Sequence, residues 1–211
     1  VYKNDGLELR LFVEDDALGG DDPYSASKAA CEILIQSTVF GQKQNLLALG
    51  RVTSVRAGNV VGGADWSEDR LIPDIIRSSI SNQPLKVRKP TAVRPWQHVL
   101  DCCYAYLLIG EYSGSYHTFN VGPSDKDFLT VERILEFSKD YFDLEDHVEP
   151  DGSKPEKMFL QLDVSRLKQE TGFEPRIKGR EMFDLTFEWY GNYLQVGECI
   201  ADRQIQAYFS V

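Results

Sequence analysis

Hydrophobic positions recur at helical spacing in some stretches of the chain and in short β-branched or alternating runs in others. The helical spacing predicts helices at 23–41, 71–81, 100–109, 130–142, 163–172 and 179–194. The β-branched and alternating runs predict strands at 51–56, 84–88, 116–122 and 160–162. We expect the stretches 57–66 and 143–157 to be loops. Strands that alternate with helices predict an α/β fold.

The first of these helices opens with a tyrosine and a lysine four residues apart. Asp22 can cap the helix, and Pro23 suits its first position. Tyr24 and Lys28 then lie on one face, one turn apart. A free tyrosine is a poor base because its pKa is about 10, and a nearby ammonium group favours the phenolate. The spacing is typical either of a pair that exchanges a proton with a substrate hydroxyl or of two solvated residues on an amphipathic helix.

Composition argues against nucleic-acid-binding, metal-binding and membrane-spanning proteins. The 211 residues carry a formal net charge of -10, which disfavours general nucleic-acid binding. The four cysteines form no Cys-x-x-Cys and the three histidines show no metal-ligand spacing, so we expect reduced thiols, no metal site and a cytoplasmic protein. No apolar run approaches the roughly 18 residues of a membrane span, and no signal peptide is evident, so we expect no membrane partner.

Further motifs follow the tyrosine–lysine pair in order. They are Arg56-Ala-Gly-Asn-Val-Val-Gly-Gly-Ala-Asp-Trp, Glu68-Asp-Arg-Leu-Ile-Pro-Asp, Val93-Arg-Pro-Trp-Gln-His-Val and Phe119-Asn-Val-Gly-Pro-Ser-Asp. Together with Pro23-Tyr-Ser-Ala-Ser-Lys they resemble the extended short-chain dehydrogenase/reductase family, and within it the branch that dehydrates CDP-glucose. The resemblance implies the remainder of a Rossmann-type parallel sheet plus a smaller α/β nucleotide-sugar-binding domain.

The resemblance does not include the family's first half. Members begin with a glycine-rich βαβ unit, and a later strand carries a Ser/Thr-Asp-Lys segment. This chain contains no Gly-x-Gly-x-x-Gly, and Val1-Tyr2-Lys3-Asn4 resembles the residues just after that segment. We therefore expect a C-terminal portion of a family member that is inactive alone, with the pyrophosphate loop and the acid and base of elimination upstream of Val1.

The resemblance also implies a reaction and its residues. The reaction is NAD-dependent dehydration of CDP-glucose to CDP-4-keto-6-deoxyglucose, in deoxysugar synthesis for surface polysaccharide such as lipopolysaccharide. Tyr24 matches the base at the sugar C4 hydroxyl, and Lys28 matches the residue that lowers its pKa and holds the nicotinamide ribose. Ala57 and Asn59 match cofactor-binding positions, and Asn59 also matches a diphosphate ligand. The remaining substrate-binding matches are Arg70, Leu71, Lys86, Val87, Arg88, Arg94 and, with a poorer local match, Glu156.

Some of these residues also have structural interpretations. Asn59 taken alone is typical of a turn. Trp96 and His98 would either wall the nucleotide pocket or pack in a core. Asn120, in the last motif, is more typical of a structural residue.

We expect residues 1–62 to form the C-terminal part of an NAD-binding Rossmann domain. Residues 63–211 would form the nucleotide-sugar-binding domain, with about 98–122 packing back on the Rossmann sheet. Small residues on the tyrosine helix, including Ala29 and Ala30, predict either a homodimer contact or close internal packing. Two other functions stay open: a non-catalytic nucleotide-sugar-binding or dimer-partner module, and another family enzyme such as an epimerase or a dTDP-sugar dehydratase.

Overall fold

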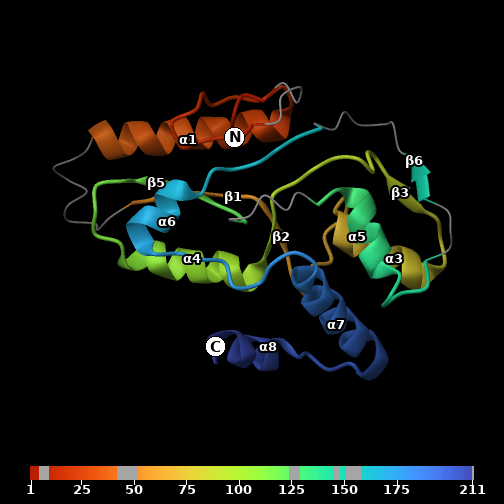
Figure 1. Ribbon diagram of the computed structural model, residues 1–211. Helices are drawn as coiled ribbons and strands as arrows, with labels where there is room; N and C mark the ends of the chain where they lie inside the picture. Colours follow the sequence, from red (N-terminus) through yellow and green to blue (C-terminus); the bar gives the residue numbers. More distant parts are fainter. Residues whose placement is uncertain (5–9, 42–51, 124–128, 145–147, 151–157, 211) are drawn as a thin grey trace.

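The computed structural model describes residues 1–4, 10–41, 52–123, 129–144, 148–150 and 158–210. Helices and short strands alternate along them (Figure 1). In chain order they are α1 (Pro23–Gly41), β1 (Ser54–Ala57), β2 (Asn59–Val61), α3 (Leu71–Ser81), β3 (Leu85–Val87), β4 (Trp96–His98), α4 (Val99–Glu111), β5 (Thr118–Val121), α5 (Val131–Ser138), β6 (Val148–Pro150), α6 (Ser165–Thr171), α7 (Glu181–Val196) and α8 (Ala201–Phe209).

All the strand pairs in the described residues are parallel. β1 pairs with β5, β2 with β4, and β3 with β6. Helix α1 lies on one side of the β1–β5 pair and α4 on the other (Figure 1). Parallel strands need crossover connections, and helices supply them here, so the α/β prediction is confirmed.

Two large hydrophobic cores support this arrangement, and a third, small cluster contains Tyr2, Phe12 and Leu162. The smaller of the two large cores lies between the β1–β5 pair and α4, where Phe119, Ala105 and Leu167 are fully buried. The larger joins α3, α5 and α7, with Ile76, Phe183 and Phe187 fully buried. This larger core therefore holds in place the part of the chain that follows β2.

Helix ends follow the capping signals of the sequence. The hydroxyl of Thr130 accepts a hydrogen bond from Arg133 N at the start of α5. The carboxylate of Asp22 accepts one from Ser25 N at the start of α1, at 3.0 Å. Gly172 ends α6 in the left-handed conformation, with φ of 70°, which glycine adopts at little cost.

Several predicted elements differ from the structure. Strand β2 lies in the predicted loop 57–66, and β6 lies in the predicted loop 143–157. The predicted strand 160–162 makes only isolated bridges, such as Phe12 with Leu162. Helix α8 has no counterpart in the prediction. Strands β2 and β6 contain three residues each without a clear alternating pattern, and they form because a neighbouring strand supplies hydrogen bonds.

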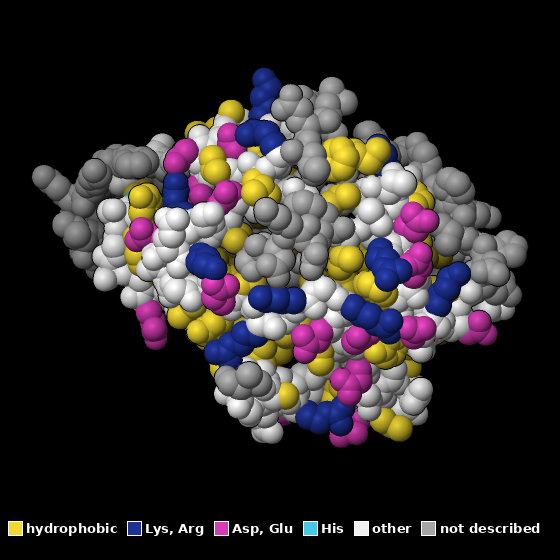
Figure 2. Space-filling view, viewed as in Figure 1, with side chains coloured by type: hydrophobic (Ala, Val, Ile, Leu, Met, Phe, Trp, Pro, Cys, Tyr) yellow, Lys and Arg dark blue, Asp and Glu magenta, His cyan; other side chains and the backbone are white. Residues whose placement is uncertain are grey.

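Within the described residues, no helix has the length and apolar character that crossing a membrane requires. Acidic and basic side chains are interspersed on the face shown in Figure 2, and neither sign gathers into one large patch there.

Candidate functional site

A cavity of about 890 Å³ runs along the carboxyl ends of β1 and β2. Parallel α/β sheets place their ligands at this edge. The predicted site residues within the described part of the chain all line it: Tyr24, Lys28, Ala57, Asn59, Arg70, Leu71, Lys86, Val87, Arg88 and Arg94. Glu156 lies outside the described residues. We call the side formed by Tyr24, Lys28 and Glu32 the α1 wall, and the side formed by 69–72 and 86–88 the α3 wall.

Tyr24 and Lys28 lie on the α1 wall as the spacing predicts. The Lys28 Nζ atom is 5.6 Å from the centroid of the Tyr24 ring. Tyr24 is 71% exposed, and Lys28 is also exposed. Both polar groups can therefore reach a molecule in the cavity. Asp22 holds the first turn beneath them, and hydrogen bonds from the Ser25 hydroxyl and backbone lower the pKa of its carboxyl.

A buried ion pair fastens the α1 wall to β1. Glu32 lies one turn beyond Lys28, and its Oε2 accepts a hydrogen bond of 2.8 Å from Nη2 of Arg56. Ser54 donates to the other carboxylate oxygen. Arg56 Nη1 also donates to the hydroxyl of Tyr2 and to the carbonyl of Glu14, at 2.9 Å each. The helix is thereby held to the sheet by directed polar contacts.

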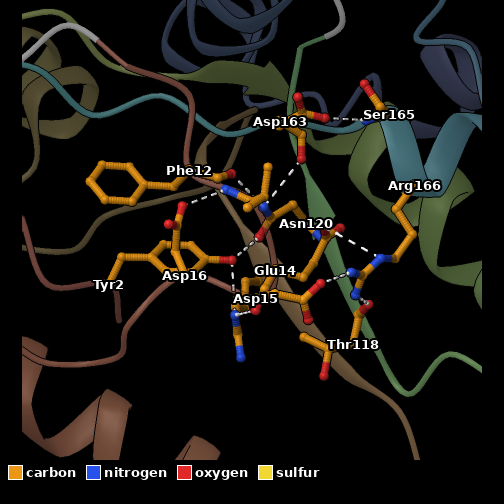
Figure 3. Close-up of polar contacts among 12 residues, drawn as sticks. Tyr2, Phe12, Glu14, Asp15, Asp16, Thr118, Asn120, Asp163, Ser165 and Arg166 are labelled. Carbon is orange, nitrogen blue, oxygen red and sulfur yellow. Dashed lines mark hydrogen bonds and ion pairs between the residues drawn. The ribbon is translucent and has the colours of Figure 1, made fainter.

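Asn120 joins this network to the rest of the sheet, as Figure 3 shows. The Tyr2 hydroxyl donates to Asn120 Oδ1 at 2.5 Å, and Asn120 Nδ2 donates to the carbonyls of Phe12 and Asp163. Burial raises the pKa of Tyr2, which keeps its hydroxyl protonated as a donor. Asn120 is fully buried and does not line the cavity, which agrees with a structural role.

Asn59, Arg94 and Trp96 lie between the two walls. Asn59 and Trp96 are opposite each other in the β2–β4 register, and both line the cavity. Arg94 is 9% exposed and donates from Nη1 to the carbonyls of Val93 and Met158, at 2.8 and 3.4 Å. Asn59 is therefore a strand residue rather than a turn residue.

Trp96 and His98 were each expected either to wall the pocket or to pack in a core, and the structure places them differently. Trp96 lines the cavity and packs edge-on against Phe183 at 6.0 Å. His98 is buried and is not among the lining residues. Its Nδ1 accepts a hydrogen bond from Leu100 N and so caps α4. Burial lowers the pKa of His98 to about 4, so the imidazole is neutral at neutral pH.

The α3 wall rests on aromatic side chains of α7. The Tyr190 hydroxyl donates to the carbonyl of Asp65 at 2.5 Å, and Trp66 lies edge-on to the Tyr190 ring at 5.3 Å. A Cβ atom on Gly63 would lie 2.2 Å from the Trp189 ring, so only glycine allows this approach. The segment after β2 is thus packed onto α7, and it leads directly into α3.

Charge in the cavity differs from the charge of the chain. The middle and the α3 wall carry the basic residues Arg70, Lys86, Arg88, Lys89 and Arg94, beside the acidic residues Asp65, Asp69 and Asp74. Groups of this kind hold phosphate oxygens through charge-assisted hydrogen bonds. In the described residues no cluster of three His, Cys, Asp or Glu residues could hold a metal ion.

Sequence reasoning did not identify Asp69, whose carboxylate lines the cavity and pairs with Arg88 at 3.2 Å. Its neighbour Arg70 was identified, so the Asp-Arg dipeptide was the available signal. The partner lies 19 residues further on, and only folding brings the two together.

Comparison with known proteins shows the family to which this chain belongs. Residues 10–122, more than half of the chain, match the NAD dependent epimerase/dehydratase family. The chain belongs to this family. Because this family is NAD dependent, the predicted cofactor, NAD, is confirmed. The resemblance of the sequence motifs to a nucleotide-sugar dehydratase family is confirmed as well.

Relatives of this epimerase/dehydratase chain include sugar-nucleotide dehydratases. It is similar to CDP-glucose 4,6-dehydratase of Salmonella typhimurium, with 34% identity over 94% of this chain and 59% of that protein. It is 27% identical to dTDP-glucose 4,6-dehydratase of Xanthomonas campestris, over 87% of this chain and 53% of that protein. The chain thus spans between half and two thirds of the length of these relatives.

Solved structures share the fold at lower identity. The crystal structure of dTDP-glucose 4,6-dehydratase from Bacillus anthracis in complex with NAD superposes with a TM-score of 0.74 and 20% identity, over 87% of this chain and 56% of that one. UDP-glucose 4-epimerase from Thermotoga maritima with UDP-glucose gives 0.70 and 20%, over 90% and 60%. These similarities confirm a Rossmann-type fold.

The cavity fits part of an NAD molecule. The Lys28 ammonium and the Tyr24 hydroxyl offer polar groups to a ribose, and both side chains are exposed on the cavity. The sequence has no Gly-x-Gly-x-x-Gly, the loop that holds a dinucleotide pyrophosphate at a helix N-terminus. The Tyr24 hydroxyl and the Lys28 ammonium therefore give the cavity polar partners for a ribose.

Proposed function

We propose that the protein carrying this chain dehydrates a nucleotide-linked hexose, with CDP-glucose as substrate and CDP-4-keto-6-deoxyglucose as product. One observation carries the proposal: a single cavity combines the exposed Tyr24–Lys28 pair with a basic middle and α3 wall. The similarity to the Salmonella enzyme favours the cytidine nucleotide.

The two ends of the cavity assign an orientation to this substrate. Helix α1 lies at the upper left and strand β3 at the right of Figure 1, and residues of both line the cavity. With the sugar at Tyr24, the diphosphate lies near Asn59 and Arg94. The base then meets the α3 wall, where Arg70, Leu71 and 86–88 lie.

Each residue then has a proposed role. NAD, when bound, supplies the acceptor and later the donor of a hydride. Tyr24 takes the proton of the C4 hydroxyl, and Lys28 favours the phenolate and holds the nicotinamide ribose, next to Ala57 and Asn59. Arg94 binds the diphosphate through charge-assisted hydrogen bonds.

Other features of the intact protein are proposals at the same level. Residues 1–62 would complete an NAD-binding domain, and 63–211 would form the nucleotide-sugar domain. Exposed Ala30, Ile33 and Leu34 on α1 support a homodimer. The buried Ala29 shows that the small residues of this helix also serve internal packing. A cytoplasmic location and a part in lipopolysaccharide synthesis complete the proposal.

The substitution Tyr24→Phe tests the catalytic assignment. Removal of the hydroxyl should lower turnover of CDP-glucose about 10²- to 10⁴-fold, the usual contribution of a positioned acid or base. The variant is made in the protein that carries this chain, supplied with NAD, and the 4-keto product is followed. CDP affinity, measured by calorimetry, should not change because the nucleotide lies away from Tyr24.

Tyr193→Phe is the matched control, since this tyrosine is exposed and does not line the cavity. Full turnover by the Tyr24→Phe variant would remove Tyr24 from the reaction. CDP binding without any product in the wild-type protein would favour the non-catalytic binding module instead.

A further inference from the structure

We propose that Asp69 and Arg88 select the base of the bound nucleotide, favouring cytosine over uracil or thymine. The proposal rests on the proposed function, because it assumes that a nucleotide occupies the cavity with its base at the α3 wall. It adds a determinant of specificity that the family match does not supply.

The two side chains form an ion pair across two segments of the α3 wall. Arg88 Nη2 donates to Asp69 Oδ1 at 3.2 Å and to the Asp69 carbonyl at 3.4 Å. The Asp69 side chain is 67% exposed and that of Arg88 is 28% exposed, and both line the cavity. A carboxylate and a guanidinium thus lie side by side on a surface that a ligand can reach.

The position of the carboxylate is fixed by the segment that carries it. The backbone of Asp69 has φ of 62°, a left-handed conformation that aspartate tolerates better than most residues. Arg77 donates to the carbonyls of Trp66 and Ser67 at 3.0 and 2.9 Å, and so holds the preceding residues on α3. Arg88 directly follows β3. Both members of the pair therefore start from anchored backbone.

The donors and acceptors of this pair match the edge of cytosine. Cytosine presents an amino donor at C4 and acceptors at N3 and O2. A carboxylate accepts from the amino group, as acidic side chains do when they read cytosine in DNA, and a guanidinium donates to N3. A carboxylate has about four acceptor sites and a guanidinium has five donors, so each can bind the other and the base together.

Uracil and thymine present the opposite pattern. They carry a carbonyl oxygen at C4 and an N–H donor at position 3. The carbonyl oxygen would face the Asp69 carboxylate, and the N–H would face the Arg88 donors. Both groups would then lose a partner and repel their neighbour, which is a strong basis for discrimination. Leu71 and the buried Val87 offer apolar contact to either base, so the difference falls on the ion pair.

The test compares the affinities of CDP and UDP for the protein that carries this chain by calorimetry. The wild-type protein should bind CDP about ten- to a hundredfold more tightly than UDP, the range of a single well-placed base contact. Asp69→Asn should bring this ratio close to one, because the asparagine amide can accept from cytosine or donate to uracil. Glu68→Gln is the control, since it removes the same charge from an adjacent exposed residue that does not line the cavity.

Each outcome has a defined meaning. An unchanged CDP-to-UDP ratio in Asp69→Asn, or equal affinities in the wild-type protein, would overturn the specificity proposal and leave the proposed function standing. A wild-type protein, carrying this chain, that binds neither nucleotide would overturn both. An equal loss of the ratio in Glu68→Gln would show a general charge effect and also refute the role of the pair. Circular dichroism of each variant confirms that the fold is retained, as expected for exposed side chains.

Discussion

The two walls of the cavity are held in place by opposite means. The α1 wall depends on the buried Glu32–Arg56 ion pair and on the hydrogen bond from Arg56 to Tyr2, and a small apolar cluster of Tyr2, Phe12 and Leu162 lies nearby. The α3 wall rests on the largest apolar core of the described residues, built from α3, α5 and α7. Directional ion-pair and hydrogen-bond contacts therefore hold the α1 wall, whereas a large buried apolar area holds the α3 wall.

This difference corresponds to what each wall does. A proton-transfer pair must point accurately at one atom, and charge-assisted hydrogen bonds specify direction. A nucleotide end needs a stable surface with a few polar groups, and a packed core provides it. The polar wall is also the more vulnerable one, because removing one partner leaves a buried charge without compensation.

The largest expected effect therefore comes from the α1 wall. Arg56→Met should lower the free energy of unfolding by about 3–5 kcal/mol, the usual result of breaking a buried ion pair from one side. Urea denaturation measures it. The double variant Arg56→Met/Glu32→Gln should recover part of the loss, because no uncompensated carboxylate remains. A loss below about 1 kcal/mol in the single variant would contradict the contrast between the walls.

A pH-dependent effect is expected at the strand between the walls. The pKa of His98 is lowered to about 4 in the folded chain, against an ordinary value of 6.5. The unfolded chain therefore binds a proton more readily, and stability falls as the pH drops from about 6.5 to about 4. One pKa unit corresponds to about 1.4 kcal/mol, so the total loss is about 3 kcal/mol.

His98→Asn should remove this part of the pH dependence and keep an acceptor for Leu100 N, since asparagine caps helices well. Thermal denaturation across this pH range measures it. His117→Asn is the control, because His117 is exposed. Parallel pH profiles for wild type and His98→Asn would refute the assignment.

The smallest effect is expected in the core behind the α3 wall. Ile76→Val removes one methylene from a fully buried side chain and should cost about 0.5–1.5 kcal/mol. Ile80→Val, in the same helix but 57% exposed, should cost almost nothing. Urea denaturation of the two variants checks this gradation. An equal cost at both positions would show that Ile80 is covered in solution.

Local chemistry made much of the site predictable. Tyr24 and Lys28 lie within one helical turn, so their relation follows from spacing alone. Arg94 and Arg70 line the cavity, and the sequence could single them out because the motifs around them resemble those of known relatives. The Glu32–Arg56 pair was not predicted, since it joins residues 24 positions apart and neither lies in a recognisable charge pattern.

The limits on predicting the fold have a similar cause. Helix α3 follows from its own apolar periodicity, α1 from the start signals Asp22 and Pro23 and the apolar run after them, and α4 from a run of apolar residues. Strands β2 and β6 contain three residues each and exist through pairing with β4 and β3. His98 could not be assigned to the core from its type, because the same residue would also suit a pocket wall. The pairing of a short strand and the burial of a histidine are decided by the segments that pack against them, which a local sequence pattern does not reveal.

The pairing of β2 with β4 restricts how this chain can change in length during evolution. Asn59 lies opposite Trp96, and both line the cavity. A one-residue insertion or deletion that shifted this register would place Gly58 or Val60 opposite Trp96 and turn each side chain to the other face. The cavity would then lose its central amide without any loss of apolar residues. Insertions and deletions should therefore survive outside these two strands, while the strands themselves accept substitutions only.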